Sequence, residues 1–401
     1  MDEKRILSDS MFHFDFLNLI SGAHDDNEKI KTCIQCGSCT GSCCAVSGMS
    51  LSPRKLWRSV QLGMEPAVMD SMSYWNCTTC GLCDKRCPRG IPLSKIMLSL
   101  REKHHRDGGS ISGVTQTIEN LKKSKNITGD DPANRFLWLD NLVLSDEDRA
   151  KLFKKQSEVV YFTGCVSVLF PQVGGIPQSL TKLLLKAGAD FSLLDEEWCC
   201  GYPVMAGGAG VENVTEYAKH NISQIEGRGA KTVIVSCPTC YYMFTKVYPD
   251  LIGGPLSFTV LHYSEYLKGL DKPASAKTTV VTYHDPCDLG RKLHITEAPR
   301  EMLKSLPGVE FREMRFSGED SKCCGGGGNL EMANPDLSGE IAAKRIAEAL
   351  DVGAEYLTSS CQQCKRTLQN AARKARARLK VLDISEFYLM QLEEAEKEAA
   401  K

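Results

Sequence analysis

Two adjacent cysteines followed by a glycine occur twice in the chain, in Glu197-Trp198-Cys199-Cys200-Gly201 and, 124 residues later, in Ser321-Lys322-Cys323-Cys324-Gly325. Other cysteines recur around each pair at nearly the same offsets, so the C-terminal part of the chain holds two sets of five. A repeat of this length predicts two copies of one domain. The first set is Cys165, Cys199, Cys200, Cys237 and Cys240, and the second is Cys287, Cys323, Cys324, Cys361 and Cys364.

Short runs of β-branched and aromatic residues lead directly into several of these cysteines. Residues 159–162 precede Cys165 and residues 279–283 precede Cys287, while amphipathic segments such as 337–349 lie between such runs. This alternation predicts an α/β fold in each copy, with a parallel sheet and crossover helices. Because sites in such sheets form beyond the carboxyl ends of the strands, we expect each five-cysteine set to form one site.

The N-terminal part of the chain has two further cysteine runs, both spaced C-x2-C-x2-C-x3-C. They predict two cubane [4Fe-4S] clusters of the bacterial ferredoxin type, in which the fourth cysteine of each run binds the cluster of the other run. Cys44 stands where proline usually follows, so Cys44 is an alternative to Cys43 as a ligand. A pair of zinc sites is the other reading, but zinc does not require this interleaving. The predicted ligands are Cys33, Cys36, Cys39 and Cys87 at the first cubane site, and Cys77, Cys80, Cys83 and Cys43 at the second.

The overall composition limits the class of protein. Nineteen cysteines in a chain of 401 residues, grouped as C-x2-C units without a signal peptide, predict a reducing compartment and therefore the cytoplasm. A net charge of -1 gives no reason to expect nucleic acid. No apolar stretch reaches the roughly 20 residues of a spanning helix, although docking on the inner face of a membrane through a partner stays open.

These patterns predict an α+β multidomain chain, in which a helical dicluster ferredoxin-like domain precedes two repeated α/β domains. The predicted limits are 1–106 for the ferredoxin-type domain, 107–156 for a connector, 157–275 for the first cysteine-rich domain and 276–401 for the second.

The cysteine signatures resemble those of the heterodisulfide reductase family. Residues 197–203 and 284–287 are similar to the paired cysteine-rich CCG domains of its B-type subunit, and residues 33–39 and 87–90 to its C-type subunit. Over roughly residues 30–390 the chain resembles the fused D-type subunit. The resemblance implies Rossmann-like CCG domains, each with a noncubane [4Fe-4S] cluster held by one five-cysteine set.

The resemblance also implies an activity and partners. The chain would be an iron-sulfur catalytic subunit that receives electrons through its cubane clusters and reduces a small disulfide, such as that of coenzymes M and B, at the noncubane pair. Implied partners are a flavin-containing A-type subunit, a membrane cytochrome b subunit or another redox enzyme subunit. The glycine-rich stretches lack a nucleotide fingerprint, so neither flavin nor nucleotide is expected on this chain.

A second function stays open, that of an electron-transfer subunit linking a dehydrogenase, an acyl-coenzyme A reductase or a membrane quinone module to another partner. The presence of all five cysteines in both copies favours the catalytic alternative. His284 is a candidate catalytic residue, either as a hydrogen-bond donor to a cluster sulfur or as an acid that protonates a leaving thiolate, and a structural role at the strand end is equally open. The cations beside the cysteines are expected to be solvated surface charges rather than substrate ligands; they are Arg291, Lys292, Lys322 and Arg366.

Overall fold

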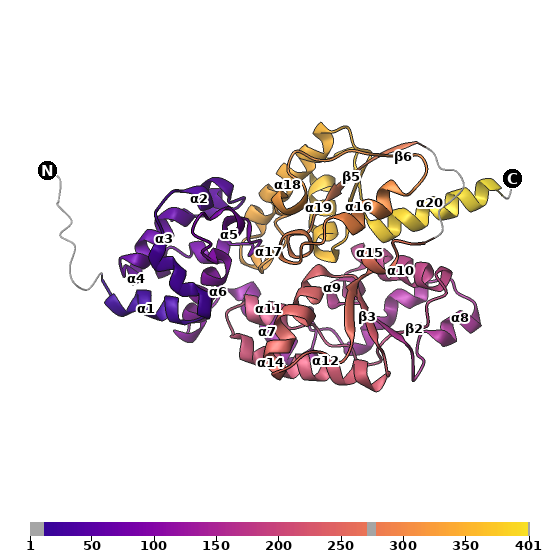
Figure 1. Cartoon of the computed structure of the whole chain (residues 1–401), viewed down its shortest axis with the longest axis horizontal. Coiled ribbons are helices and arrows are strands. Elements are labelled where there is room, and N and C mark those ends of the chain that lie inside the picture. The colour runs from indigo at the N-terminus through magenta and orange to yellow at the C-terminus, as the bar shows by residue number, and fades with distance from the viewer. Residues whose placement is uncertain (1–11, 271–277, 400–401) are drawn as a thin grey trace.

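The computed structural model describes residues 12–270 and 278–399, and a helical part at one end precedes two sheet-containing parts (Figure 1). Apolar side chains at helical spacing, including Trp57, Ile96 and Leu100, form the core of the helical part. No strand occurs among its described residues. Its elements are α1 (Phe14–Gly22), η2 (Asp25–Thr32), α2 (Ser38–Ser42), η3 (Val46–Gly48), α3 (Pro53–Gln61), α4 (Glu65–Asp70), η4 (Ser73–Asn76), α5 (Leu82–Arg86) and α6 (Leu93–Arg106).

The first sheet has four parallel strands in the order β2-β1-β3-β4. The run expected to be a strand at residues 159–162 forms the inner strand β1, and Val160 lies opposite Val233 of β3. Its elements are β1 (Val159–Phe162), α9 (Cys165–Leu169), η6 (Pro171–Val173), α10 (Gly175–Lys186), β2 (Phe191–Ser192), α11 (Tyr202–Ala206), η7 (Val211–Val214), α12 (Thr215–Gly227), β3 (Thr232–Val235), α13 (Pro238–Tyr242), η8 (Met243–Val247), α14 (Tyr248–Ile252), β4 (Thr259–His262) and α15 (Tyr263–Tyr266).

The second sheet repeats this topology with four parallel strands in the order β6-β5-β7-β8. The same order in both sheets confirms the predicted repeat and the predicted fold class, in which a helical ferredoxin-like part precedes two α/β units. Its elements are β5 (Thr279–His284), η9 (Cys287–Lys292), α16 (Glu297–Lys304), β6 (Val309–Phe311), η10 (Gly318–Asp320), α17 (Leu330–Ala333), α18 (Pro335–Asp351), β7 (Tyr356–Ser359), α19 (Gln362–Lys374), β8 (Lys380–Asp383) and α20 (Ile384–Ala399).

The two repeats pack against each other around a shared apolar core. Helix α10 of the first repeat lies beside α20 of the second (Figure 1), and Leu180 and Phe387 belong to the same buried cluster. At this interface the Tyr263 hydroxyl donates a 2.6 Å hydrogen bond to Asp383 Oδ1. Because this core contains side chains from both repeats, it fixes the two sheets relative to each other.

The segment predicted as a connector is built into the fold. It forms α7 (Ser112–Ser124), η5 (Pro132–Asn141) and α8 (Asp146–Lys151), and Val114, Ile118 and Leu121 of α7 are buried. The predicted domain limits stay predictions, and the one at 275/276 lies outside the described residues. Among the described residues, no helix combines the length and apolar character that a membrane span requires.

The glycines after Cys324 bring the second repeat against the helical part. Gly328 has a φ of +59°, and a Cβ at this position would lie 2.7 Å from the Thr78 carbonyl carbon. A side chain here is therefore excluded twice, by the left-handed backbone conformation and by the neighbouring main chain.

We expect Gly328→Ala to lower the free energy of unfolding by about 1–3 kcal/mol, because alanine is strained at positive φ and clashes with Thr78. The matched control is Gly339→Ala, which lies within α18 with open space around its Cβ position and should raise stability by about 0.5–1 kcal/mol. Chemical denaturation of the two variants checks this, and equal effects would contradict the close approach at Gly328.

Candidate metal centres

The first cubane site gathers cysteines from both N-terminal runs. Cys33, Cys36 and Cys39 line one small pocket together with Cys87, the last cysteine of the second run. Cys36 is exposed, and hydrogen bonding to Ser38, 3.4 Å away, lowers its thiol pKa. The structure thus places the four predicted ligands around one space, which fits a group that binds four thiolates.

At the second cubane site, Cys43 follows the end of α2, Cys77 and Cys80 precede α5, and Cys83 lies within α5. Burial, together with the charges of Cys77 and Cys80, raises the pKa of the Cys43 thiol to about 12. Burial likewise raises the pKa of Cys77 to about 11. Such thiols stay protonated at neutral pH, so a cation must displace their protons before they become ligands.

Cys43 and Cys44 both pack against the core of the helical part, but Cys44 also packs against the core of the second repeat. Its thiol lies within hydrogen-bonding contact of Cys80 and of Cys323, a member of the second five-cysteine set. Cys44 and Cys80 also pack together against the apolar cluster that contains Cys323. The structure places Cys44 between this site and the second repeat, and Cys43 stays the predicted fourth cysteine of the second cubane site.

The first five-cysteine site lies beyond the carboxyl ends of strands β1 and β3. Cys165 begins α9 directly after β1, and its Sγ is 3.6 Å from Cys199 Sγ. Hydrogen bonds to Cys199 and Cys240 lower the pKa of Cys200 to about 6. All five cysteines of the set line one cavity of about 280 Å³.

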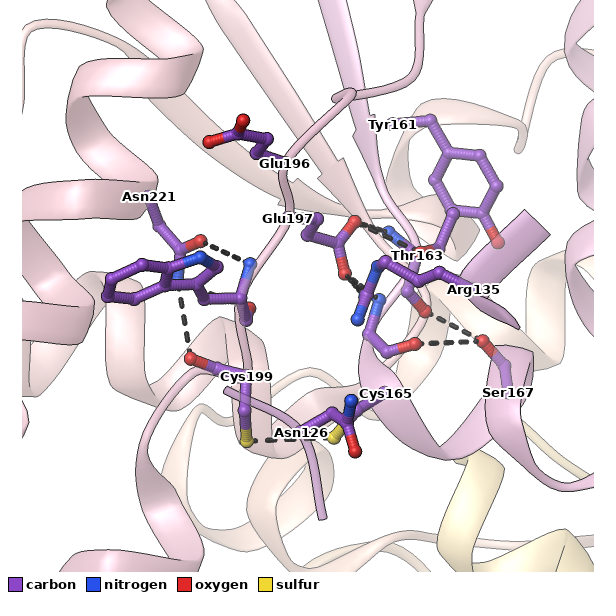
Figure 2. A network of polar contacts seen from close by, with 12 residues as sticks. Asn126, Arg135, Tyr161, Thr163, Cys165, Ser167, Glu196, Glu197, Cys199 and Asn221 are labelled. Carbon is purple, nitrogen blue, oxygen red and sulfur yellow. Dashed lines mark hydrogen bonds and ion pairs between the residues drawn. The ribbon is translucent and has the colours of Figure 1, made fainter. Parts of the chain in front are cut away.

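Two polar clamps hold the loops that carry Cys165 and Cys199 (Figure 2). The Glu197 carboxylate accepts hydrogen bonds from the backbone N–H groups of Thr163 (2.7 Å) and Gly164 (2.8 Å), and it forms a buried ion pair with Arg135. Asn221 Oδ1 accepts from the Trp198 N–H at 3.0 Å, and its Nδ2 donates to the Cys199 carbonyl at 3.3 Å. These contacts fix the two loops before any metal binds.

The second five-cysteine site has the equivalent place in the second sheet. Cys324 Sγ lies 3.3 Å from Cys364 Sγ, and the backbone N–H groups of Gly325 and Gly326 donate to the sulfurs of Cys323 and Cys324 at 3.3 and 3.4 Å. Amides aimed at sulfur stabilise negative charge on a thiolate. Cys361 begins α19, and Cys287 follows β5 at the start of η9.

His284 lies against this second site. Arg345 Nε donates to His284 Nδ1 at 3.1 Å, and a His284 ring nitrogen lies within 4.8 Å of the sulfurs of Cys324 and Cys364. Burial lowers the pKa of His284, which favours the neutral ring. With Nδ1 accepting from Arg345, the proton of the neutral ring is at Nε2. His284 is not among the residues that line the cavity, so its surroundings favour contact with a cysteine sulfur over contact with a substrate.

Gln362 is a site residue that the sequence pattern did not reveal. It belongs to the second repeat, but its Nε2 donates to the Thr163 carbonyl at 2.6 Å and its Oε1 accepts from the Ser167 N–H at 3.0 Å, both in the first repeat. Its only sequence signal is its place directly after Cys361, at the carboxyl end of strand β7.

Three of the flanking cations differ from the expectation of solvated surface charge, and one of them is Lys292, whose side chain is 18 % exposed and pairs with Asp288 at 2.8 Å. Arg291 is 6 % exposed. Arg366 lines the cavity, where it forms a 2.5 Å ion pair with Glu331 and lies over the Phe170 ring. Contacts between segments far apart in the sequence bury Arg291 and half-bury Arg366.

Comparison with known proteins gives independent evidence about the same regions. The family described as "Cysteine-rich domain" matches residues 159–245 and 281–369, and the "4Fe-4S dicluster domain" matches residues 32–92. The D-type subunit of the dihydromethanophenazine:CoB–CoM heterodisulfide reductase of Methanosarcina acetivorans is 31 % identical over 388 residues, covering 89 % of this chain and 92 % of that protein.

Two further similarities are more distant. A protein of Syntrophomonas wolfei named EtfAB:quinone oxidoreductase is 29 % identical over 346 residues, covering 80 % of this chain and 46 % of that protein. The crystal structure of a hypothetical protein from Helicobacter pylori matches with a TM-score of 0.50 and 11 % identity, covering 94 % of this chain and 75 % of that chain. At this identity the structural match is evidence about the fold alone.

We expect Glu197→Ala to destabilise the protein by about 3–5 kcal/mol, because it leaves Arg135 buried without a partner. Iron bound at the first five-cysteine site should fall in parallel, since the loops that carry Cys165 and Cys199 lose their clamp. The control is Glu196→Ala, whose exposed side chain points away from the network (Figure 2) and should change stability by less than about 0.5 kcal/mol. Denaturation and iron analysis of both variants check this, and equal behaviour would refute the clamp.

Proposed function

We propose that this chain, which belongs to the family of D-type heterodisulfide reductase subunits, reduces a small disulfide. As an iron-sulfur oxidoreductase subunit, it would do so in the cavity next to its two five-cysteine sites. The observation that carries the proposal is the make-up of that cavity. One wall holds all five cysteines of the first set, and another is formed by Gly326–Gly328 and Gln362, which lie close in sequence to Cys324 and Cys361 of the second set. One cavity therefore adjoins both sites.

We infer that the four cysteine groups hold four clusters, a cubane at each N-terminal site and a noncubane [4Fe-4S] cluster at each five-cysteine site. A bound cluster supplies one electron at a time, so a pair matches the two electrons that a disulfide requires. In the overall reaction the S–S bond breaks, and each sulfur gains one electron and one proton to give two thiols.

The other side chains of the cavity favour a partly apolar substrate. Ile127, Val166, Phe170 and Met332 exclude water from its walls. Arg366 is the one cationic side chain among the described residues that line it, and its Nε has no hydrogen-bond partner there. Arg366 is therefore suited to hold an anionic group of the substrate, because a guanidinium binds carboxylate or phosphate oxygens well.

The proposed electron donor is a partner subunit that docks near the first cubane site. Exposure of Cys36 supports this, since a donor can approach that site from solvent. A flavin-containing A-type subunit, a membrane cytochrome b subunit or another redox enzyme subunit would fill this role, with the chain in the cytoplasm or docked on the inner face of the membrane through its partner. Neither flavin nor nucleotide is proposed on this chain.

The similarity to an EtfAB:quinone oxidoreductase favours one alternative, in which the chain only transfers electrons between a dehydrogenase, acyl-coenzyme A reductase or quinone module and another partner. In that case the cavity would bind no disulfide. The two functions differ in whether reduced protein reacts directly with a small disulfide.

Protein purified without oxygen should contain about sixteen iron atoms per chain, four for each of four clusters. Iron and sulfide analysis with Mössbauer spectroscopy checks this number and separates cubane from noncubane iron. About eight iron atoms with stoichiometric zinc would show that the five-cysteine sets hold zinc instead.

Fully reduced protein should be reoxidised by a suitable small disulfide, because the cavity brings the disulfide against both five-cysteine sites. Cys200→Ala and Cys324→Ala should each lower the rate of this reoxidation by at least about 100-fold, since each removes a ligand of one of the two one-electron donors. Rapid mixing under anaerobic conditions measures the rate, and unchanged cubane spectra serve as the control. No reaction with any of a panel of disulfides would support the electron-transfer function.

A further inference from the structure

Arg101, in α6, is completely buried beside the second cubane site, yet it forms no ion pair with a carboxylate of the described residues. Its guanidinium donates only to backbone carbonyls. Nη2 donates to Cys77 at 2.6 Å, and Nη1 donates to Ala206 of the first repeat at 2.9 Å and to Gly328 of the second repeat at 2.8 Å. The Arg101 side chain thus links the loop that carries Cys77, a predicted cluster ligand, to both repeats.

Arg291 approaches the same site from the second repeat. Its Nη1 donates to the Cys80 carbonyl at 2.7 Å, and its other donors reach the carbonyls of Glu319 and Ser321. It too forms no ion pair within the described part of the chain. The nearby Asp320 makes its ion pairs with Lys85 and Arg86.

Other buried arginines of the chain have acidic partners. Arg135 pairs with Glu197, Arg300 with Asp285, and Arg345 with Glu348. A buried cation without compensating negative charge is costly. For Arg101 the neighbouring ligand is Cys77, whose carbonyl accepts from Nη2 at 2.6 Å, so negative charge on a group bound at this site would compensate the guanidinium.

Within the described chain, the pocket of the first cubane site is not lined by a buried cation of this kind. Arg54 and Arg89 line its pocket, but both are exposed, so solvent and salt screen their charges. One group opposes the cations at the second site: the half-buried Asp84 carboxylate accepts from the Ser94 N–H at 2.8 Å and lies 3.4 Å from Cys83 Sγ. Two buried guanidinium groups against one carboxylate leave the second site the more positive of the two.

We propose that Arg101 and Arg291 raise the reduction potential of the second cubane cluster above that of the first, so that an electron taken up at the exposed first site moves inward. The inference rests on the proposed occupancy of the cubane sites by clusters. Positive charge near a cluster stabilises its reduced form, because reduction adds one negative charge. Each transfer oxidises the first cluster and reduces the second by one electron.

The position of the second site fits this direction. Cys44 contacts both Cys80 and Cys323, and the Arg291 guanidinium spans the second repeat and Cys80. An electron held at the second cubane site is therefore next to the second five-cysteine site. The two arginines are charge-compensating residues, since they act on the cluster through the backbone and the electrostatic field and do not touch a substrate.

The test is a redox titration of the iron-loaded protein, followed by electron paramagnetic resonance. The Cys36→Ser variant assigns the signal of the first cubane cluster. In Arg101→Gln and in Arg291→Gln the second cluster should be harder to reduce, with the ratio of reduced to oxidised cluster falling about tenfold at a fixed potential, which is about 59 mV for one electron. Arg101→Lys and Arg291→Lys keep the charge and should shift the potential much less.

Two controls separate a charge effect from structural damage. Asp84→Asn removes the opposing negative charge and should shift the second cluster in the other direction, toward easier reduction. Arg89→Gln, at the exposed first site, should leave both potentials nearly unchanged. If Arg101→Gln fails to fold, Arg291→Gln and Asp84→Asn still carry the test.

The outcomes separate this inference from the proposed function. Missing cubane iron in the unaltered protein would refute the proposed cofactors. Full cubane iron with a first cluster that is easier to reduce than the second, or with the same potentials in the glutamine variants, would refute the role of the two arginines. Reactivity toward disulfides does not enter this result.

Discussion

Buried thiolates repel one another, and the rest of the structure has to hold several of them together. The sulfurs of Cys165 and Cys199 are 3.6 Å apart, and those of Cys324 and Cys364 are 3.3 Å apart. Burial and neighbouring cysteines raise the pKa of thiols such as Cys43, which makes a charged thiolate costly there. Stable thiolate groups therefore require rigid loops, nearby donors and a bound cation.

Both repeats hold their cysteines at the carboxyl ends of parallel strands. Parallel strands end at one edge of each sheet, and cysteines follow directly after β1, β3, β5 and β7 or within a few residues of them. Glu197 and Asn221 clamp the loops of the first repeat, whereas glycine amides after Cys323 and Cys324 donate to sulfur in the second. The shared core between α10 and α20 holds the two repeats together, and one cavity is lined by the first set of cysteines and by residues close in sequence to the second set.

The order of the sites from solvent to cavity follows from this packing. The first cubane site has an exposed cysteine, and the second lies at the junction of three parts of the chain, where Arg101 binds carbonyls from each of them. Cys80, Cys44 and Cys323 are in contact across that junction. The same contacts that assemble the protein therefore place its redox sites next to one another.

The sequence by itself determined the cysteine groups, the repeat and the strands, because these depend on spacing within short segments. A run such as Cys33-x2-Cys36-x2-Cys39 and a β-branched run such as 159–162 are local patterns, and the structure gathers the cysteines of this run with Cys87 around one pocket and the first five-cysteine set around another. Only the tertiary structure decided that Arg291 is buried, that Gln362 reaches into the first repeat and that His284 faces Cys324 rather than the cavity. These features depend on how segments more than a hundred residues apart, or on different elements, pack together, and sequence spacing carries no information about that distance.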